Sequence, residues 1–331
     1  MKNLMMRFLL VAASLSCIAF MAVTQDAIGQ VWPSRPIRLI LPLAAGSALD
    51  TVTRGLAQAL AADLGQAVVV DNRSGVDMIT GTEVCAKSPP DGYTVCITAK
   101  SVFAYNPQIY RKLPYDPDKD FAPVTNIVNL ASVITVHPSL KVNSLKELVA
   151  LAAAQPGVLN YGSMGPATTG FMTWEWIKKK NNIELVHVPF KSPPQLVQAV
   201  VSGEVQTAYF SIAGFLGHIR SGRLKALAVS STRRSPLLPE VPTLAQAGVS
   251  GLHADVWFGL VAPAGTPRDT VVRLQRAITR IVAVPEFREK FLLSQGWDPV
   301  APNTPEEFAR EIEKDRAEGA ELIRITGARI E

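Results

Sequence analysis

Short apolar runs alternate with stretches of helical period along the chain from residue 36 onward. Residues 37–41 form an apolar run typical of a buried strand, and apolar side chains then recur at every fourth position from Val52 to Leu64. Gly65 ends this predicted helix. A strand over 68–70, a helix near 79–87 and a strand over 93–98 follow. This β-α-β-α-β order predicts a doubly wound, mostly parallel sheet, which binds ligands outside the carboxyl ends of its strands.

The same alternation returns after an extended segment at 132–136. We predict strands over 159–162, 185–188, 205–210 and 224–229, with helices near 169–180, 193–201 and 212–220 between them. Residues 256–261 form a second extended crossing, and Pro267 and Pro305 begin two C-terminal helices. The sequence therefore predicts an α/β fold of two lobes, each with a doubly wound, mostly parallel sheet, joined by two hinge crossings. We expect lobe 1 to comprise 30–128 and 258–331, with the C-terminal helices packed on it, and lobe 2 to comprise 129–257.

The first 29 residues have the pattern of an export signal. Lys2 and Arg7 flank the start of an apolar run of 16 residues, from Phe8 to Val23, and small residues then supply a cleavage site after Gly29. The run is shorter than the ~20 residues that a membrane-spanning helix needs. We therefore predict a signal peptide over 1–29 and a soluble mature protein in the periplasm.

The composition is that of a globular protein. The 331 residues are 48% hydrophobic and 18% charged, which excludes a fibre or a coiled coil. The formal charge of +5 comes from scattered Lys and Arg residues, and the one dense basic run is Lys178 to Lys180. Three lysines at the end of a predicted helix complement the helix dipole. We therefore expect a solvated helix end there and no nucleic-acid partner.

Two cysteines, Cys85 and Cys96, follow the predicted signal peptide. An oxidising compartment permits a disulfide between them. Cys85 falls in a helical pattern and Cys96 in an apolar strand, where a cysteine ordinarily behaves as a small buried hydrophobe. The pattern therefore favours two unbridged cysteines and leaves the disulfide as the alternative.

Each predicted lobe contains one loop with the chemistry of an anion site. Residues 42–47 and residues 163–168 each join the end of a strand to the beginning of a helix. A helix N-terminus attracts an anion through its unpaired N–H groups and its dipole. Two such loops facing each other across a cleft would hold a carboxylate, with Ser47, Ser163 and Thr168 as side-chain contributors. The alternative is that small residues merely let each strand-to-helix turn pack tightly.

A series of short motifs in fixed order runs along nearly the whole mature chain. In the first half these are Trp32-Pro33-Ser34-Arg35-Pro36-Ile37, Pro42 with Gly46 and Asp50, Asn72-Arg73 with Gly75, Pro90-Asp91-Gly92-Tyr93-Thr94, Asn106-Pro107 and Leu113-Pro114-Tyr115-Asp116. Later come Leu159-Asn160-Tyr161, His187-Val188-Pro189-Phe190-Lys191, Pro239-Glu240-Val241-Pro242-Thr243 and Trp257-Phe258-Gly259-Leu260. In these motifs the chain is similar to the periplasmic solute receptors of tripartite tricarboxylate transporters, also called the Bordetella uptake gene family.

This resemblance implies a two-lobed periplasmic-binding-protein fold, type II-like, that closes on a small carboxylate and delivers it to the permease subunits of the transporter. It implies a monomer that binds its ligand without a metal or cofactor and is not an enzyme. The ligand positions carried over from the family are Leu43, Ala44, Ala45, Gly46, Ser47, Asp50, Lys100, Ser101, Ser163, Gly165, Pro166, Ala167, Thr168, Phe210 and Ser211.

The chain departs from the family pattern at several of these positions. Lys100 lies where the family has a polar loop rich in glycine and threonine, and Phe210 and Ser211 stand where it commonly has an Asp-Asn pair. We therefore expect an added positive charge, a lost carboxylate and more aromatic surface at the cleft, which favours an aromatic or flat carboxylate. The rings that support this expectation are Phe103, Phe171, Phe190, Phe210 and Trp257. The alternative is that most of these rings are core residues and that Lys100 points to solvent.

Two other functions compete with the receptor. A serine hydrolase would place its nucleophile in G-x-S-x-G, and Ser163 does not fit because Tyr161 occupies the first glycine position. The four histidines have no metal-site spacing, and no P-loop or G-x-G-x-x-G follows a strand. A periplasmic sensor that binds the same ligand and passes a signal to a partner cannot be separated from a transport receptor by sequence.

Overall fold

A computed structural model describes residues 32–231, 233–252 and 254–327. The predicted signal peptide at 1–29 lies outside the described residues. Residues up to Arg35 belong to a separate unit, and the fold below is that of the unit that begins at Pro36. Within the described ranges, no helix combines the length and the hydropathy needed to cross a bilayer.

The first sheet has six strands among the described residues, in the order β11-β4-β10-β3-β1-β2. Their bounds are β1 Ile37–Leu41, β2 Val68–Asn72, β3 Thr94–Ala99, β4 Phe121–Leu130, β10 Val256–Pro263 and β11 Trp297–Pro299. β1 pairs in parallel with β2 and β3, whereas β10 runs antiparallel to β3 and β4, and β11 runs antiparallel to β4. The helices that follow its strands are α2 Ala48–Leu64, α3 Ile79–Ala86, α4 Lys100–Ala104 and α5 Asn106–Ile109. We call this sheet, with its helices, lobe 1.

The second sheet has five strands among the described residues, in the order β7-β6-β8-β5-β9. These are β5 Ser132–Val136, β6 Asn160–Ser163, β7 Val186–Pro189, β8 Thr207–Ser211 and β9 Lys225–Val229. β6 pairs in parallel with β7 and β8, and β5 pairs antiparallel with β8 and β9. Its helices are α6 Leu145–Ala154, α7 Thr169–Asn181, α8 Pro193–Ser202 and α9 Ile212–Arg220. We call this sheet, with its helices, lobe 2.

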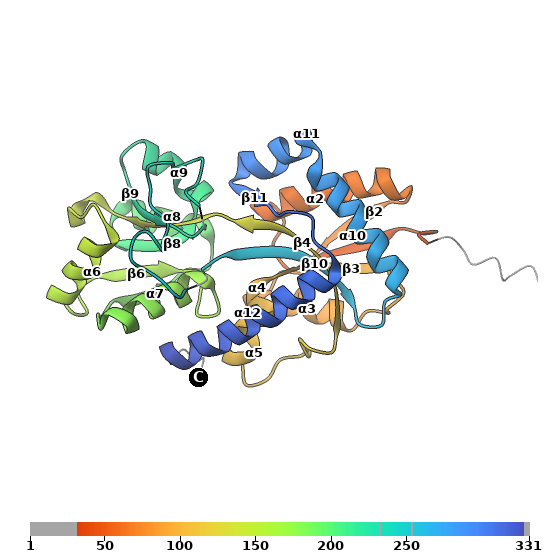
Figure 1. Cartoon of the computed structure of the whole chain (residues 1–331), viewed down its shortest axis with the longest axis horizontal. Helices are drawn as coiled ribbons and strands as arrows, with labels where there is room; N and C mark the ends of the chain where they lie inside the picture. Colours follow the sequence, from red (N-terminus) through yellow and green to blue (C-terminus); the bar gives the residue numbers. More distant parts are fainter. Residues whose placement is uncertain (1–31, 232, 253, 328–331) are drawn as a thin grey trace, which may run out of the picture. The chain divides into compact units, whose positions relative to one another are not determined.

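The chain passes between the lobes on two neighbouring strands (Figure 1). β4 ends in the first sheet at Leu130, and β5 begins in the second at Ser132. The return path enters the first sheet at Val256, which pairs with Leu130. The predicted two-lobed α/β fold is therefore confirmed. Each sheet is mixed, however, and the expectation of mostly parallel sheets was wrong because the crossing strands add antiparallel pairs to both.

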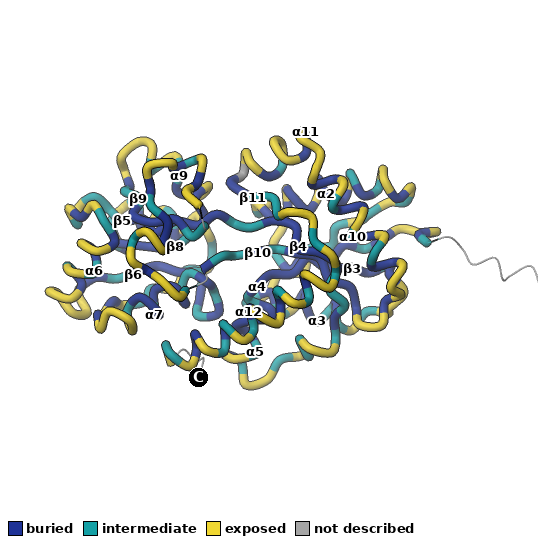
Figure 2. The backbone as a smooth tube through the Cα atoms, viewed as in Figure 1, coloured by how far each residue is buried: buried dark blue, intermediate teal, exposed yellow. Residues whose placement is uncertain are grey.

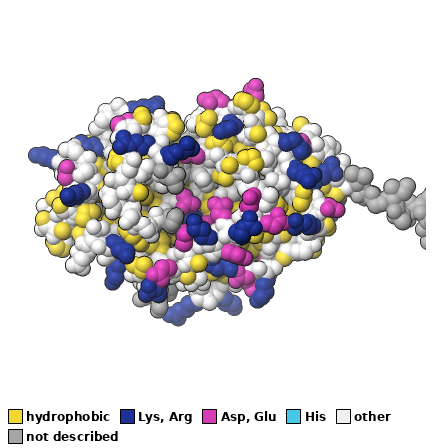
Figure 3. Space-filling model, viewed as in Figure 1, with side chains coloured by type: hydrophobic (Ala, Val, Ile, Leu, Met, Phe, Trp, Pro, Cys, Tyr) yellow, Lys and Arg dark blue, Asp and Glu magenta, His cyan; other side chains and the backbone are white. Residues whose placement is uncertain are grey.

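The C-terminal helices are α10 Arg268–Ala283, α11 Pro285–Phe287 and α12 Pro305–Thr326. Short 3-10 segments cover Val76–Met78, Pro138–Leu140 and Leu293–Gln295, and a π-helical turn covers Arg288–Leu292. α10 packs on α2 and β4 of lobe 1. A capping box between Thr304 and Glu307 begins α12, which contacts α4 of lobe 1 and also α7 of lobe 2. Side chains of both charge signs lie intermingled over α12 (Figure 3).

Buried residues follow the strands of both sheets (Figure 2). One apolar cluster joins the lobes, because Leu322 and Ile323 of α12 and Tyr105 of lobe 1 pack with Trp174 and Trp176 of α7. At about 25 cal/mol per Å² of buried apolar surface, side chains of this size contribute several kcal/mol to the association of the lobes.

Cys85 and Cys96 form a disulfide that ties α3 to β3. The sequence pattern favoured two unbridged cysteines, and that expectation was wrong. Both residues are buried, as expected, but helix packing brings their Cα atoms to 6.2 Å, which is within the range that a disulfide spans. Sequence spacing alone contained no information about this proximity.

Candidate functional site

The first candidate loop, residues 42–47, joins the end of β1 to the beginning of α2. Ser47 has an extended backbone, and its hydroxyl accepts a hydrogen bond from the N–H of Asp50 at 3.1 Å, so it is the N-cap of α2. Gly46, just before it, has a φ of 80°, a left-handed conformation that favours glycine. The sequence thus places a short hydroxyl and a glycine at the N-terminus of α2, which is the positive end of the helix dipole.

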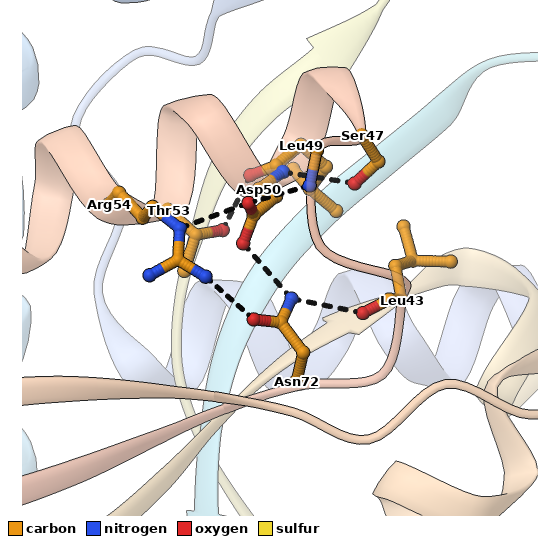
Figure 4. Close-up of polar contacts among 8 residues, drawn as sticks. Leu43, Ser47, Leu49, Asp50, Thr53, Arg54 and Asn72 are labelled. Carbon is orange, nitrogen blue, oxygen red and sulfur yellow. Dashed lines mark hydrogen bonds and ion pairs between the residues drawn. The ribbon is translucent and has the colours of Figure 1, made fainter.

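Asp50 holds this loop in place (Figure 4). Its side chain is buried, and its carboxylate accepts from the N–H of Gly46 at 2.9 Å, from Nε of Arg54 at 3.0 Å and from Nδ2 of Asn72 at 2.9 Å. Asn72, the last residue of β2, also donates to the carbonyl of Leu43 at 3.1 Å. Burial alone would raise the pKa of Asp50, but the hydrogen bonds outweigh it and lower that pKa, so the carboxylate stays charged.

The same hydrogen bonds decide which amides of the loop remain for a ligand. Gly46 is among the predicted ligand positions, but its N–H donates to Asp50. In the described part of the chain, no protein group accepts from the N–H groups of Ala44, Ala45, Ala48 or Leu49. These four amides, two in the loop and two in the first turn of α2, are the donors that an anion at this loop would meet.

The second candidate loop, residues 163–168, joins β6 to α7. Thr168 is the N-cap of α7: its hydroxyl accepts from the N–H of Phe171 at 3.5 Å and donates to the carbonyl of Gly165 at 2.6 Å. The N–H of Gly165 donates to Oγ of Ser163 at 3.1 Å. Among the described residues, the N–H groups of Thr169 and Gly170 have no protein acceptor. Lobe 2 therefore repeats the capped helix N-terminus of lobe 1.

Ser163 is buried, and its hydroxyl is engaged within the protein. It lies 2.8 Å from Nε2 of His187 and 3.3 Å from the carbonyl of Gly165. The His187 ring stacks on Tyr161 with centroids 5.0 Å apart and meets the edge of Phe171 at 4.7 Å. Burial lowers the pKa of His187; Lys178 acts in the same direction and Glu175 opposes them. Ser163 thus fixes the conformation of the loop, and a neutral His187 holds the Ser163 hydroxyl through a hydrogen bond.

Lys100 is buried and paired with two carboxylates. Its side chain is 2% exposed, and its Nζ lies 3.2 Å from Oδ1 of Asp255 and 2.9 Å from Oδ1 of Asp315. The Nε1 of Trp257 donates to the other oxygen of Asp315 at 2.5 Å. The two carboxylates compensate the positive charge of Lys100, and the alternative of a solvent-facing lysine was wrong. A cavity of about 330 Å³ adjoins Lys100, and none of residues 42–47 or 163–168 lines it.

The aromatic residues divide into two groups. Phe103 and Trp257 are fully buried and stack on each other with centroids 6.4 Å apart, so they are core residues. Phe171, Phe190 and Phe210 are partly exposed, and Phe210 packs edge-on against Phe215 at 6.2 Å. The other predicted positions also differ in exposure: Ala167 and Ser211 are buried, whereas Leu43, Ser101 and Pro166 are partly exposed. The surplus of rings near the loops is therefore smaller than the sequence suggested.

Sequence reasoning assigned no role to Asn72, Arg54 or His187. Asn72 and Arg54 complete the network around Asp50, and Nη2 of Arg54 donates to Oδ1 of Asn72 at 2.7 Å. The signal for Asn72 was available, because parallel neighbouring strands end at the same sheet edge, and Asn72 pairs in register with Leu41 at the end of β1. The signal for His187 was its position on the strand next to β6, where it pairs with Tyr161.

Both loops thus present capped helix N-termini with spare amide donors, one at the carboxyl end of β1 and one at that of β6. Such an arrangement binds a small anion by hydrogen bonds and by the helix dipole, each terminus contributing roughly 0.3–1 kcal/mol when exposed and up to ~2 kcal/mol when partly buried. No side-chain nucleophile is needed for this chemistry. Each loop therefore has the chemistry to bind a small anion.

Solved structures of known proteins share this architecture. The structure described as R. palustris Rpa4515 with adipate matches with a TM-score of 0.81 and 31% identity, covering 90% of this chain and 100% of that chain. MatC from Rhodopseudomonas palustris with bound malate matches with a TM-score of 0.77 and 26% identity, covering 88% of this chain and 100% of that one. Both are similar to this chain over almost its whole length.

Sequence comparison agrees with the structural one. A UPF0065 protein in the tcbD-tcbE intergenic region of Pseudomonas sp. (strain P51) is 34% identical over 293 residues, which cover 88% of this chain and 86% of that protein. The family model described as the tripartite tricarboxylate transporter family receptor matches residues 52–327. The proteins of this kind are periplasmic solute-binding receptors, as the sequence resemblance implied. The chain belongs to the tripartite tricarboxylate transporter receptor family.

Proposed function

We propose that this protein captures a small carboxylate between its lobes and delivers it to the membrane subunits of a tripartite tricarboxylate-type transporter. The observation that carries the proposal is the pair of capped helix N-termini, one in each lobe, with Ala44, Ala45, Ala48 and Leu49 as amide donors in lobe 1. Family relatives that hold adipate and malate support the same ligand class. The protein acts as a monomeric receptor without cofactor or metal.

Closure of the lobes completes the site in this proposal. The sheet pairing supports hinges at Ala131 and just before Val256, close to the predicted lobe limits of 129–257 for lobe 2 and 30–128 with 258–331 for lobe 1. The lobes already touch beside Ser211, because a Cβ atom on Gly296 of lobe 1 would lie 2.9 Å from the Cβ atom of Ala213 in α9. Rotation about two neighbouring strands brings the loops together around the ligand.

The ligand carboxylates are held chiefly by backbone N–H groups, with Ser47 and Thr168 nearby. Lys100 is neutralised by its aspartates, so selectivity rests on the walls of the site. The walls combine the exposed methyl groups of Ala44 and Ala45 with the partly exposed rings of Phe171, Phe190 and Phe210. Such walls favour a ligand with a flat or apolar body between its polar ends, an aromatic carboxylate included.

A thermal-shift screen tests the function. Adipate, malate, succinate and benzoate are compared with the matching carboxamides, which keep the shape and lose the charge. A carboxylate at 100 times its dissociation constant adds about 2.7 kcal/mol to the free energy of unfolding, so the melting temperature rises by several degrees. The proposal fails if no acid raises the melting temperature, or if each amide raises it as much as its acid.

Glycine substitutions test the site itself. Gly46→Val and Gly165→Val force a β-branched residue into left-handed backbone, with φ values of 80° and 121°, and nothing lies within 4 Å of the new Cβ atom. Gly222→Val is the matched control, because Gly222 has a φ of 74° and equally open space. We expect all three variants to lose similar stability and only the first two to lose affinity for the acid found in the screen. Equal affinity in all three would remove the loops from the site.

A further inference from the structure

The return path from lobe 2 to lobe 1 changes lobes within one peptide unit. The carbonyl of Ala254 accepts a hydrogen bond from the hydroxyl of Tyr209, which belongs to β8 of lobe 2. The next residue, Asp255, binds Nζ of Lys100 at the beginning of α4 in lobe 1. Val256 then pairs with Leu130 in the first sheet. Successive residues of the crossing are therefore held by opposite lobes.

The two aspartates that contact Lys100 have different roles. Asp315 is buried and accepts hydrogen bonds from both Lys100 and Trp257, so separating it from Lys100 would leave its carboxylate in the protein interior without a counter-charge. The side chain of Asp255 is 41% exposed. If Asp255 leaves, its carboxylate is hydrated, while Lys100 and Asp315 remain a neutral buried pair. Asp255 is thus the contact that the lobes can break and remake.

Lys100 stays charged throughout such a movement. Burial alone would lower the pKa of its ammonium group, but Tyr105, Asp255 and Asp315 act in the opposite direction and raise that pKa above its usual value. The ammonium group is also fixed in position, because Lys100 begins α4 directly after the buried strand β3. The crossing therefore always faces a rigid positive charge of lobe 1.

We propose that the Lys100–Asp255 ion pair is a hinge latch that favours the lobe arrangement in which Gly296 contacts Ala213. In this role Lys100 is a positioning residue that acts on the ligand through the lobe angle and does not touch it. The latch exists with or without ligand, and only its effect on affinity rests on the proposed function. Lys100, which the sequence resemblance placed among the ligand positions, thus belongs to the hinge in this proposal.

The test variant is Asp255→Asn, which removes the charge and keeps the shape of a half-exposed side chain. Lys100→Met is unsuitable because it would leave the buried carboxylate of Asp315 without a counter-charge. Asp63→Asn is the matched control, since it removes an ion pair with Arg280 that joins α2 and α10 within lobe 1. Asp255→Glu keeps the charge and should restore the behaviour of the wild type.

Spin labels at the exposed positions Gln58 of α2 and Lys146 of α6 report the distance between the lobes without ligand. We expect Asp255→Asn to broaden the distance distribution, and Asp63→Asn and Asp255→Glu to leave it like the wild type. A distribution unchanged in Asp255→Asn, or one equally broadened in Asp63→Asn, overturns the latch. This measurement decides the inference even if no carboxylate binds.

An affinity measurement adds a second readout for adipate as the probe. Because a partly exposed ion pair contributes up to about 1 kcal/mol, we expect Asp255→Asn to raise the dissociation constant roughly three- to fivefold. High salt should reduce that ratio by screening the pair in the wild type. If Asp255→Asn broadens the distance distribution but leaves the affinity for adipate unchanged, the latch does not position the lobes for binding, and that role is rejected. Absence of adipate binding in every variant would instead count against adipate as the ligand.

Discussion

Replacing Asp50 with alanine should cost both stability and affinity, because one carboxylate ties together the loop, the helix and the neighbouring strand. The change removes the acceptor of three hydrogen bonds, from Gly46, Arg54 and Asn72. Loss of the partly buried hydrogen bond from Asn72 lowers the free energy of unfolding by about 1 kcal/mol. The exposed amide of Gly46 regains a hydrogen bond to water, so its loss costs about half as much. Loss of the exposed ion pair with Arg54 costs roughly 0.3–0.5 kcal/mol. We expect a loss of about 2 kcal/mol in the free energy of unfolding.

Urea unfolding of Asp50→Ala beside Asp63→Ala measures this loss. The control also removes an ion pair, but one made by an exposed arginine at the surface of lobe 1, so it should cost less than about 1 kcal/mol. The pKa of Asp50 is lowered in the folded state, so its contribution to stability is present above the unfolded value of about 3.8 and is lost as the pH falls below it. The difference between wild type and Asp50→Ala should therefore be full at pH 7 and shrink below pH 4.

Binding adds a separate criterion for the same variant. Without Asp50 the amide of Gly46 becomes free and the loop loses its attachment to Asn72, so the spare donors are no longer held in one arrangement. We expect affinity for the carboxylate to fall by more than tenfold, which corresponds to about 1.4 kcal/mol. Equal stability loss in both alanine variants, or unchanged affinity in Asp50→Ala, would refute this account of the loop.

Further variants address the contact between Gly296 and Ala213, the second loop and the disulfide. Gly296→Ala places a Cβ atom 2.9 Å from that of Ala213, so it should hold the lobes apart and weaken binding, and Ala213→Gly in the same chain should recover part of the affinity in titration calorimetry. His187→Gln should flatten the pH dependence of stability below pH 6.5. Because the pKa of His187 is lowered in the folded state, the unfolded wild type binds the extra proton, so the stability of the wild type decreases as the pH decreases. Urea unfolding at pH 7.5 and 5.5 will measure this difference. Replacing Cys85 and Cys96 together with serine should lower the free energy of unfolding by about 2–4 kcal/mol in denaturant titrations.

The elements that the sequence predicted well have a local cause. The apolar runs at β1 and β5 begin and end at the predicted residues, as does α9. β4 was missed because Pro123, Asn126 and Asn129 interrupt its apolar pattern. That strand forms because β10, more than a hundred residues away, supplies its hydrogen-bond partners. Pairings between distant segments are also why the sheets are mixed.

The candidate site shows the same division between local and distant causes. Ser47 and Thr168 were predicted as members of the two strand-to-helix loops, and both cap the helix that follows, because capping depends on residues three positions apart. The surroundings of Lys100 depend on Asp255 and Asp315, which are far from it in sequence. Sequence position at the end of a strand therefore indicated that Lys100 was near the lobe boundary, but its partners decided what it does there.

The contact between α12 and α7 has a calorimetric consequence. Leu322 and Ile323 belong to the same apolar cluster as Trp176, so any rotation of the lobes changes the water-exposed apolar area at this surface. Exposure of apolar surface to water raises the heat capacity, and its burial lowers it. The heat-capacity change of ligand binding will then include hydration of side chains that no ligand touches. A heat capacity of binding larger than the ligand's own surface can explain would be the signature of α12 moving against α7.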